Sequence, residues 1–216
     1  MRHDPARLVP LQHWEIWKVG EARQCVPPAD DMDVAALALE SAEVLQALRR
    51  TWIFLSLSHL ISPYREVAEY VVAGYPDEAP VDIGDQRTFP LRVFITRRIP
   101  PPSNVAWETP PNVDIDLFLE YAETGTDSSR EEVRTPPLRG VSGAVVWAVL
   151  PSQGTPVVWT PTGPTIPRMR VAAIQSSYSH RSFIRAKKLN VLEPVIRALD
   201  TQAASRIGGV LRGGPL

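Results

Sequence analysis

Short hydrophobic runs, each bounded by proline, glycine or aspartate, recur along the whole chain. Nine of them have the length of β-strands: Leu8–Val19, Met32–Leu39, Thr51–Ser58, Val67–Tyr75, Phe89–Ile99, Val113–Tyr121, Gly143–Leu150, Thr155–Thr160 and Arg168–Gln175. In several runs apolar and other side chains alternate, so that Leu91, Val93 and Ile95 share one strand face. Many short strands at this spacing predict an all-β barrel or sandwich.

Helical patterns are confined to two segments. Residues 41–50 fit a short helix capped by Ser41, and a strand followed by a loop fits them almost as well. Near the C-terminus, Asn190 followed by Glu193 has capping-box spacing. An apolar stripe at helical spacing follows, made of Leu192, Val195, Ile196 and Leu199. We expect this helix to pack on the barrel, and we expect irregular loops at Pro100–Pro111 and Glu123–Pro137.

Composition supports the β-rich interpretation and excludes several classes of function. The 216 residues include 22 prolines, about twice the average usage, and long helices do not accommodate that many. With 23 basic and 24 acidic residues the formal net charge is 23 − 24 = −1, which argues against nucleic acid as a partner. The single cysteine, Cys25, forms no intramolecular disulfide, and we interpret it as a packing residue rather than a nucleophile.

No membrane or export signal is visible in the residues given. Met1–Trp17 has no apolar stretch of signal-peptide length, and four prolines interrupt the longest uncharged run, Gly140–Pro167. We therefore expect no contact with a membrane and a cytoplasmic location.

The candidate chemistry centres on Gly140-Val141-Ser142-Gly143, which lies between a charged loop and a hydrophobic strand. Acyl transfer needs a hydroxyl on a sharp turn with backbone N–H groups facing the developing oxyanion, and flanking glycines permit such a turn. An α/β-hydrolase elbow requires glycine two residues after the serine; that position is Ala144, so this class is excluded.

Four segments, in order along the chain and with Gly140–Gly143 among them, resemble segments of the chymotrypsin-like (trypsin-like) serine peptidases, bacterial type. Asp31–Leu37 resembles the strand with the triad aspartate, and Tyr70–Pro76 the first strand of the second barrel. Gly140–Gly143 matches the Gly-x-Ser-Gly nucleophile turn, and Arg170–Ser177 resembles the strand that forms the substrate-side wall. The closing helix is also where that family places one.

The resemblance implies a two-barrel chymotrypsin-like fold with a partial first barrel and a C-terminal α-helix. Six of the predicted strands lie between Val67 and Gln175, the number that a complete second barrel needs, and only three precede them. We therefore expect a partial N-terminal barrel half over 1–66, a C-terminal barrel half with the nucleophile turn over 67–188, a helix over 189–207 and a flexible tail over 208–216.

The resemblance also implies a catalytic triad and an oxyanion hole, and needs no cofactor or metal. Ser142 would be the nucleophile, Asp33 would orient the base, and the N–H groups of Gly140 and Ser142 would form the oxyanion hole. His3 is the preferred base, because its separation from Asp33 leaves room for two strands. The other histidines fit less well: His13 lies within a strand-like run, and His59 and His180 follow the aspartate.

The remaining site residues are the substrate-binding candidates Pro136, Gln175, Ser176 and Ser177. Pro136, six residues before Ser142, offers no carboxylate to a basic side chain, and Val141 replaces the aspartate that commonly precedes the nucleophile. Activation by cleavage of a propeptide is therefore not implied.

Two charged groups are interpreted as surface features. Asp114 and Asp116 share one face of their strand, and we expect that face to be solvated rather than to hold a metal or an acid/base pair. The basic cluster Arg181, Arg185, Lys187 and Lys188 is interpreted as surface charge before the helix, with an acidic partner as the alternative.

Three functions remain open at the level of sequence. The first is a serine endopeptidase with a protein or peptide substrate. The second is a catalytically inactive or truncated relative that binds peptides, whose incomplete first barrel would be covered by an upstream segment or a partner domain. The third is an unrelated all-β binding protein in which Gly140–Gly143 is only a turn.

Overall fold

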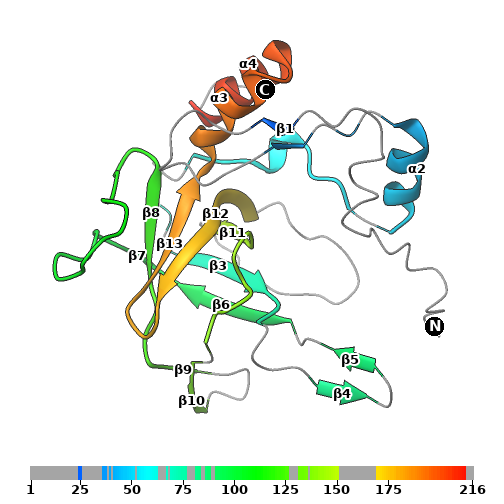
Figure 1. Ribbon diagram of the computed structural model, residues 1–216. Helices are drawn as coiled ribbons and strands as arrows, with labels where there is room; N and C mark the ends of the chain where they lie inside the picture. The colour runs from blue at the N-terminus through cyan, green and yellow to red at the C-terminus, as the bar shows by residue number, and fades with distance from the viewer. Residues whose placement is uncertain are drawn as a thin grey trace.

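A curled, barrel-like antiparallel sheet of seven strands dominates the computed structural model shown in Figure 1. The structure describes residues 24–25, 36–37, 39, 41–51, 53–62, 67, 69–76, 81–83, 86–88, 91–126, 131–135, 137–150 and 169–212. In spatial order the strands are β6 (Arg92–Thr96), β3 (Glu69–Gly74), β11 (Val145–Val149), β12 (Met169–Ser179), β13 (Phe183–Lys188), β8 (Asp116–Glu120) and β7 (Arg98–Ile99). The protein is thus mostly β in the described part, as its sequence predicts.

The two edges of the sheet meet at one residue. The edge strands β6 and β7 follow one another in the chain and only Arg97 separates them. Hydrogen bonds continue across this point, from Glu120 N to Arg97 O (2.9 Å) and from Thr96 Oγ1 to Glu120 O (2.6 Å). With β6 and β7 counted as one bent strand, the fourth strand of the sheet lies beside the first, which is Greek-key order.

Three two-stranded ribbons and helix α2 (Ala42–Thr51) precede or interrupt the strands of this sheet along the chain. The ribbons are β1 (Gln24–Cys25) with β2 (Ala36–Leu37), β4 (Val81–Ile83) with β5 (Gln86–Thr88), and β9 (Thr124–Thr126) with β10 (Glu132–Arg134). Of the two structures predicted for residues 41–50, the helix is the one observed, as α2. Ser41 Oγ accepts a hydrogen bond from Val44 N (3.4 Å) at its start. The ribbon β9–β10 corrects the expectation that Glu123–Pro137 is an irregular loop.

One hydrophobic core fills the interior of the curled sheet. Most of its fully buried members alternate along the strands, as a two-residue period requires, and the adjacent pair Ala172 and Ala173 lies where a β-bulge shifts the register of β12 against β11. These members include Tyr70, Val72, Leu117, Leu119, Val146, Ala148, Ala172, Ala173, Ile184 and Ala186. The interior of the barrel-like sheet is therefore packed with side chains.

A second hydrophobic cluster joins the outer face of the sheet to the C-terminal helices, η3 (Leu189–Val191), α3 (Leu192–Arg197) and α4 (Thr201–Leu211). Val171 on β12 belongs to it together with Leu189, Ile207 and Leu211. The 3-10 helix η2 (Leu57–His59) covers the same face, because Leu60 bridges to Val171 and Ile61 N donates to Val171 O (2.9 Å).

The C-terminal segment differs from its expected form in three ways. The single helix is divided at Ala198–Asp200, and Asp200 caps α4 by accepting bonds from Gln202 N and Ala203 N. The expected capping box is absent, because Asn190 Nδ2 donates to Asp114 O and Glu193 pairs with arginines. Helix α4 also continues through the first four residues of the expected tail, since Ile207, Gly208 and Leu211 are buried against the sheet and α3.

The predicted strands are reproduced unevenly. Val67–Tyr75, Phe89–Ile99, Val113–Tyr121, Gly143–Leu150 and Arg168–Gln175 contain β3, β6 with β7, β8, β11 and part of β12. Thr51–Ser58 is not a strand, because α2 ends and η2 begins within it. Leu8–Val19 and Thr155–Thr160 lie outside the described residues. The sheet instead contains β13, which was not predicted as a strand because its Arg185, Lys187 and Lys188 were interpreted as surface charge.

The alternation along β6 is confirmed, but its apolar face points outward. Leu91, Val93 and Ile95 are all at least half exposed, whereas Phe94 packs on the core. No helix in the described part of the chain is both long and apolar enough to span a bilayer.

Candidate functional site

Ser142 lies in the second of two consecutive tight turns that precede β11. Val141 N donates to Leu138 O (3.0 Å) and closes the first turn, and Ala144 N donates to Val141 O (2.9 Å) and closes the second. The third position of each turn is a glycine with positive φ, 86° at Gly140 and 89° at Gly143. A positive φ at this position is what type II turns require and what glycine adopts without strain. The two glycines around Ser142 are therefore explained by backbone geometry.

The side chain of Val141 anchors the turn to the core. It is only 2% exposed, and a Cβ placed on Gly74, at the end of β3, would lie 2.6 Å from Val141 Cγ1. The close approach of the turn to β3 therefore depends on Gly74 having no side chain. Hydrophobic packing of Val141 thus holds the turn, at the position where chymotrypsin-like peptidases commonly carry an aspartate.

Backbone N–H groups alternate between bonded and open along this turn. Val141 N and Gly143 N donate to Leu138 O and Gln175 O, the latter at 2.9 Å. No described residue accepts a bond from the N–H of Gly140 or of Ser142, and both residues are exposed. The two donors predicted as an oxyanion hole are therefore available to a ligand.

The turn is fastened to β12 at the predicted substrate-binding residues. Gln175 N donates to Ala144 O (2.8 Å), and Ser142 Oγ donates to Ser176 O at 3.1 Å. A β-bulge at Gln175–Ser177 in the pairing with β13 turns Ser176 out of the regular ladder. The structure thus brings Gly140, Ser142, Gln175 and Ser176 together.

Beside Ser142, β12 has an open edge. Strand β11 pairs with β12 only from Met169 to Ile174, whereas β13 pairs with it as far as Ser179. Past Gln175, no described strand occupies the side of β12 on which β11 lies, and Ser177 is exposed there. An extended peptide can add to such an edge through main-chain hydrogen bonds.

Neither described histidine is hydrogen-bonded to Ser142. His59 Nδ1 bonds Ser56 Oγ (2.8 Å), and the next residue bridges to Val171, five residues or about 16 Å along β12 from Ser176. His180 follows the last residue of β12, four residues beyond Ser176, and its ring lies 6.2 Å from that of Tyr121. The predicted base His3, its alternative His13, the orienting Asp33 and the pocket residue Pro136 lie outside the described residues.

A buried charge cluster lies elsewhere, on β8 and β13. It corrects the interpretation of Asp116, Arg185, Lys187 and Lys188 as surface charge, whereas Asp114 is exposed as expected. Asp116 is 3% exposed, and its carboxylate accepts bonds from Arg185 Nη2 (2.5 Å) and Lys187 Nζ (2.8 Å). Arg185, Lys187 and Lys188 are all below 7% exposed. Burial raises the pKa of Asp116, but the hydrogen bonds from Arg185 and Lys187 outweigh it and hold this pKa below its usual value.

The sequence carried one signal for this cluster that the surface interpretation missed. Arg185 and Lys187 have the two-residue spacing of one strand face, and Asp116 carries the opposite charge at one end of another strand. Cross-strand pairing of opposite charges joins such groups. Pairing of β13 with β8 places Lys187 directly opposite Asp116.

Neither the side chains able to bind a metal nor the comparisons with known proteins assign a function to this site. No group of three or more histidine, cysteine, aspartate or glutamate side chains able to hold a metal occurs in the part of the chain that the structure describes. No protein-family model, curated protein or solved structure matches the chain. The resemblance to chymotrypsin-like peptidases therefore remains a prediction.

Proposed function

We propose that this protein is a serine peptidase that cleaves peptide bonds, with Ser142 as the nucleophile. The observation that carries the proposal is the hydrogen-bond pattern at residues 140–143, which leaves two N–H donors open beside an exposed hydroxyl. Donors fixed in place before reaction stabilise the oxyanion of a tetrahedral intermediate, and this is commonly the largest catalytic contribution.

The open edge of β12 supports a peptide as the substrate. A peptide extended along Ser176 and Ser177 would form main-chain hydrogen bonds with β12 and present a carbonyl to Ser142 Oγ. When β6 and β7 are counted as one bent strand, the sheet contains six strands, from β3 to β13 along the chain. Six is the number that the resemblance implies for the second barrel.

In the proposed mechanism Ser142 Oγ forms a bond to the carbonyl carbon while its proton passes to His3, which Asp33 orients. The proton then moves to the leaving amine as the C–N bond breaks, which leaves an acyl ester on Ser142. Water hydrolyses the ester by the same steps, with His3 again as base and then acid. The N–H groups of Gly140 and Ser142 hold the oxyanion at both stages.

A second candidate function is peptide binding without catalysis. One observation favours it: the described partner of Ser142 Oγ is the carbonyl oxygen of Ser176, which cannot take the proton as a base would. Both functions use the open edge of β12, and only the first needs an imidazole at Ser142.

Labelling with a fluorophosphonate, read by intact mass, tests the proposal, because the reagent reacts with activated serines. We expect one adduct on the wild-type chain and none on Ser142→Ala or His3→Ala. Ser103→Ala, which removes a hydroxyl from an exposed loop, is the matched control and should label as the wild type does.

Absence of an adduct on folded wild-type protein would reject the peptidase and favour the peptide-binding module. An adduct that survives Ser142→Ala would also reject the assignment, because the reactive serine would lie elsewhere. Circular dichroism of each variant establishes that it is folded.

A further inference from the structure

A second candidate site, distinct from Ser142, lies against strands β7 and β8. A pocket of about 410 Å³ is lined by Arg98, Ile99, Pro100, Pro101, Val113, Asp116 and Phe118. This volume is in the range of pockets that take small organic ligands, about 300–1,000 Å³. In the sheet, β8 and β7 are three and four strands away from β11, which follows the Ser142 turn.

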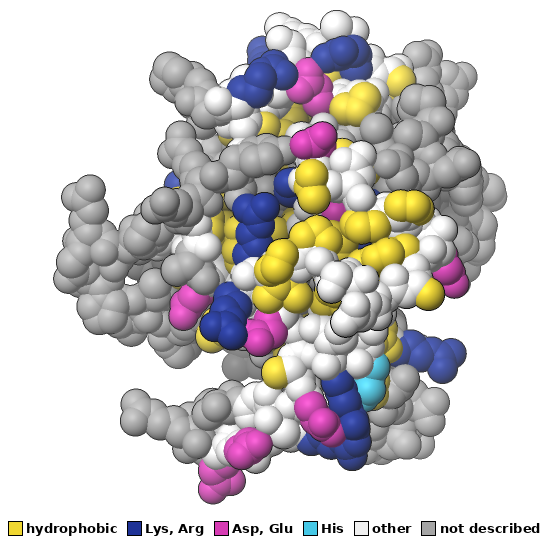
Figure 2. Space-filling view, turned by 90° about the vertical axis from the view of Figure 1, so that its left-hand side faces the viewer, with side chains coloured by type: hydrophobic (Ala, Val, Ile, Leu, Met, Phe, Trp, Pro, Cys, Tyr) yellow, Lys and Arg dark blue, Asp and Glu magenta, His cyan; other side chains and the backbone are white. Residues whose placement is uncertain are grey.

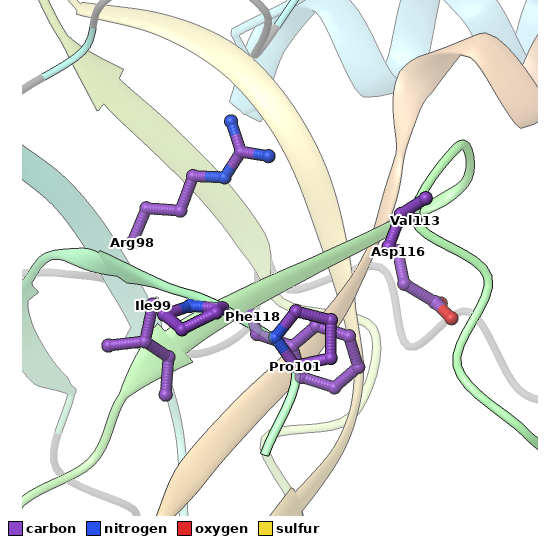
Figure 3. Close-up of a pocket in the computed structure, with 7 residues that line it drawn as sticks. Arg98, Ile99, Pro101, Val113, Asp116 and Phe118 are labelled. Carbon is purple, nitrogen blue, oxygen red and sulfur yellow. The ribbon is translucent and has the colours of Figure 1, made fainter. Parts of the chain in front are cut away.

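The pocket combines a charged part with an apolar part. Figure 3 shows Arg98 on one side, Asp116 and Val113 on the other, and Ile99, Pro101 and Phe118 grouped together. Figure 2 views the molecule from the side on which β7 and β8 lie in Figure 1; hydrophobic side chains gather in the middle of this face with Lys and Arg side chains beside them. Such a surface suits a ligand with one charged and one apolar end.

The charged part has an excess of positive charge. Asp116 is shared by the buried Arg185 and Lys187, and its Oδ2 also accepts a bond from Asn112 N (2.8 Å). Arg98 is exposed and makes no ion pair with a described residue.

Lys188, only 1% exposed, donates to Val113 O and lies within the electrostatic influence of Arg98, Asp114 and Asp116. Four cations, Arg98, Arg185, Lys187 and Lys188, thus surround two carboxylates, Asp114 and Asp116, for a local charge of 4 − 2 = +2.

This excess is costly unless an anion offsets it. Burial and the charge of Arg98 lower the pKa of Lys188, as expected where like charges lie close together in a partly dry site. The Asp116 carboxylate is already engaged by two cations and a backbone N–H, and Asp114 and Asp116 offset part of the charge of Lys188, so the exposed Arg98 is the member of this set that makes no ion pair with a described residue. An anion from solution would complete the set, and the guanidinium fork of Arg98 matches the geometry of carboxylates and phosphates.

We propose that this pocket binds a small organic anion, whose carboxylate or phosphate group lies at Arg98 and whose apolar body packs on Pro100, Pro101 and Phe118. The apolar lining distinguishes this ligand from a free inorganic ion. The cations Arg185 and Lys187, fixed by Asp116, supply a constant positive field behind the pocket.

Titration calorimetry of the full chain tests the proposal with four probes: benzoate, phenyl phosphate, neutral benzamide and inorganic phosphate. We expect benzoate or phenyl phosphate to bind, and which of the two binds more tightly identifies the charged group. Benzamide and inorganic phosphate should bind at least about tenfold more weakly than the better of them, because each lacks one of the two features.

The variant Arg98→Gln should weaken binding of the better probe about tenfold or more, and Arg98→Lys should restore part of the loss. Arg97→Gln is the matched control, because the neighbouring Arg97 pairs with Glu120 on the surface (2.7 Å) and does not line the pocket. Arg98 is exposed, so its replacement is not expected to unfold the protein, and thermal unfolding of each variant checks this.

Four results would overturn the inference. Benzamide that binds as tightly as benzoate and phenyl phosphate would remove the anionic requirement, and inorganic phosphate that binds as tightly would remove the apolar one. Equal losses in Arg97→Gln and Arg98→Gln, or no binding of any probe to the folded protein, would exclude the pocket.

Discussion

At the scale of single residues, the turn around Ser142 depends on two glycines that a side chain would strain. Gly140 and Gly143 both have positive φ, and Ser142 between them is exposed with its hydroxyl on Ser176 O. The glycine conformations are local, and the sequence pattern Gly-x-Ser-Gly predicts them, whereas the bond to Ser176 joins residues 34 positions apart.

Gly143→Ala should therefore lower the free energy of unfolding by about 1–2 kcal/mol, because an alanine with φ of 89° is strained although the space around it is open. Urea unfolding measures the effect. Gly125→Ala is the control, since Gly125 also has open space and no positive φ. Equal stability of the two variants would contradict the strain argument.

Asp116 is the other residue whose role is set by its immediate partners. Asp116→Asn should cost about 3–5 kcal/mol of unfolding free energy, because it leaves two buried cations without their carboxylate. The exposed Asp114→Asn is the control and should cost much less.

The lowered pKa of Asp116 also predicts a pH dependence. A carboxyl whose pKa is lower in the folded than in the unfolded chain contributes stability above the unfolded value, about 3.9, and that contribution is lost as the pH falls through the folded value. Acid unfolding of the wild type should thus be steeper below about pH 4 than that of Asp116→Asn. Identical slopes would contradict this.

At the scale of elements, the turn before β11 and the end of β3 form one packed unit. The Cβ of an alanine at position 74 would lie 2.6 Å from Val141 Cγ1, and valine has little rotational freedom to move away. Nothing in either segment alone predicts this contact, because Val141 lies 67 positions after Gly74 in the chain (141 − 74 = 67).

Gly74→Ala should therefore destabilise the protein by about 1–3 kcal/mol and reduce fluorophosphonate labelling of Ser142. The double variant Gly74→Ala, Val141→Ala should recover part of the stability, because the second change removes the opposing methyl group. Thermal unfolding and labelling of the two single variants and the double variant form the cycle. Additive losses would show that the two residues do not interact.

The predicted elements succeed where the chemistry is local and fail where it is not. Strands β3, β8 and β11 follow from short apolar runs bounded by proline, glycine or aspartate, and α4 continues past its expected end because Ile207 and Leu211 are buried against the sheet. Strand β13 was missed because Arg185, Lys187 and Lys188 were interpreted as solvated, and only a neighbouring carboxylate makes their burial favourable.

At the scale of the whole molecule, two hydrophobic clusters lie on opposite faces of the same strands. The interior cluster includes Val72 and Val146, and the outer one joins Val171 to the C-terminal helices. Strands covered on both faces should be the most stable part of the described fold.

Hydrogen exchange followed by mass spectrometry should accordingly find the slowest amides in β3, β11 and β12. The ribbon β9–β10 should exchange much faster, because Glu132, Val133 and Arg134 are all exposed. Comparable protection of the ribbon and the sheet would contradict this ranking of local stability.

The sequence by itself determined the β-rich class, most strands of the central sheet and the glycine turn around Ser142, because alternation and glycine geometry act over a few residues. Tertiary structure decided the closure of the sheet at Arg97, the outward apolar face of β6 and the burial of Asp116 with three cations. Each of these depends on which distant strand becomes a neighbour, since a charged or apolar side chain gains its partner or its cover only when the sheet has assembled.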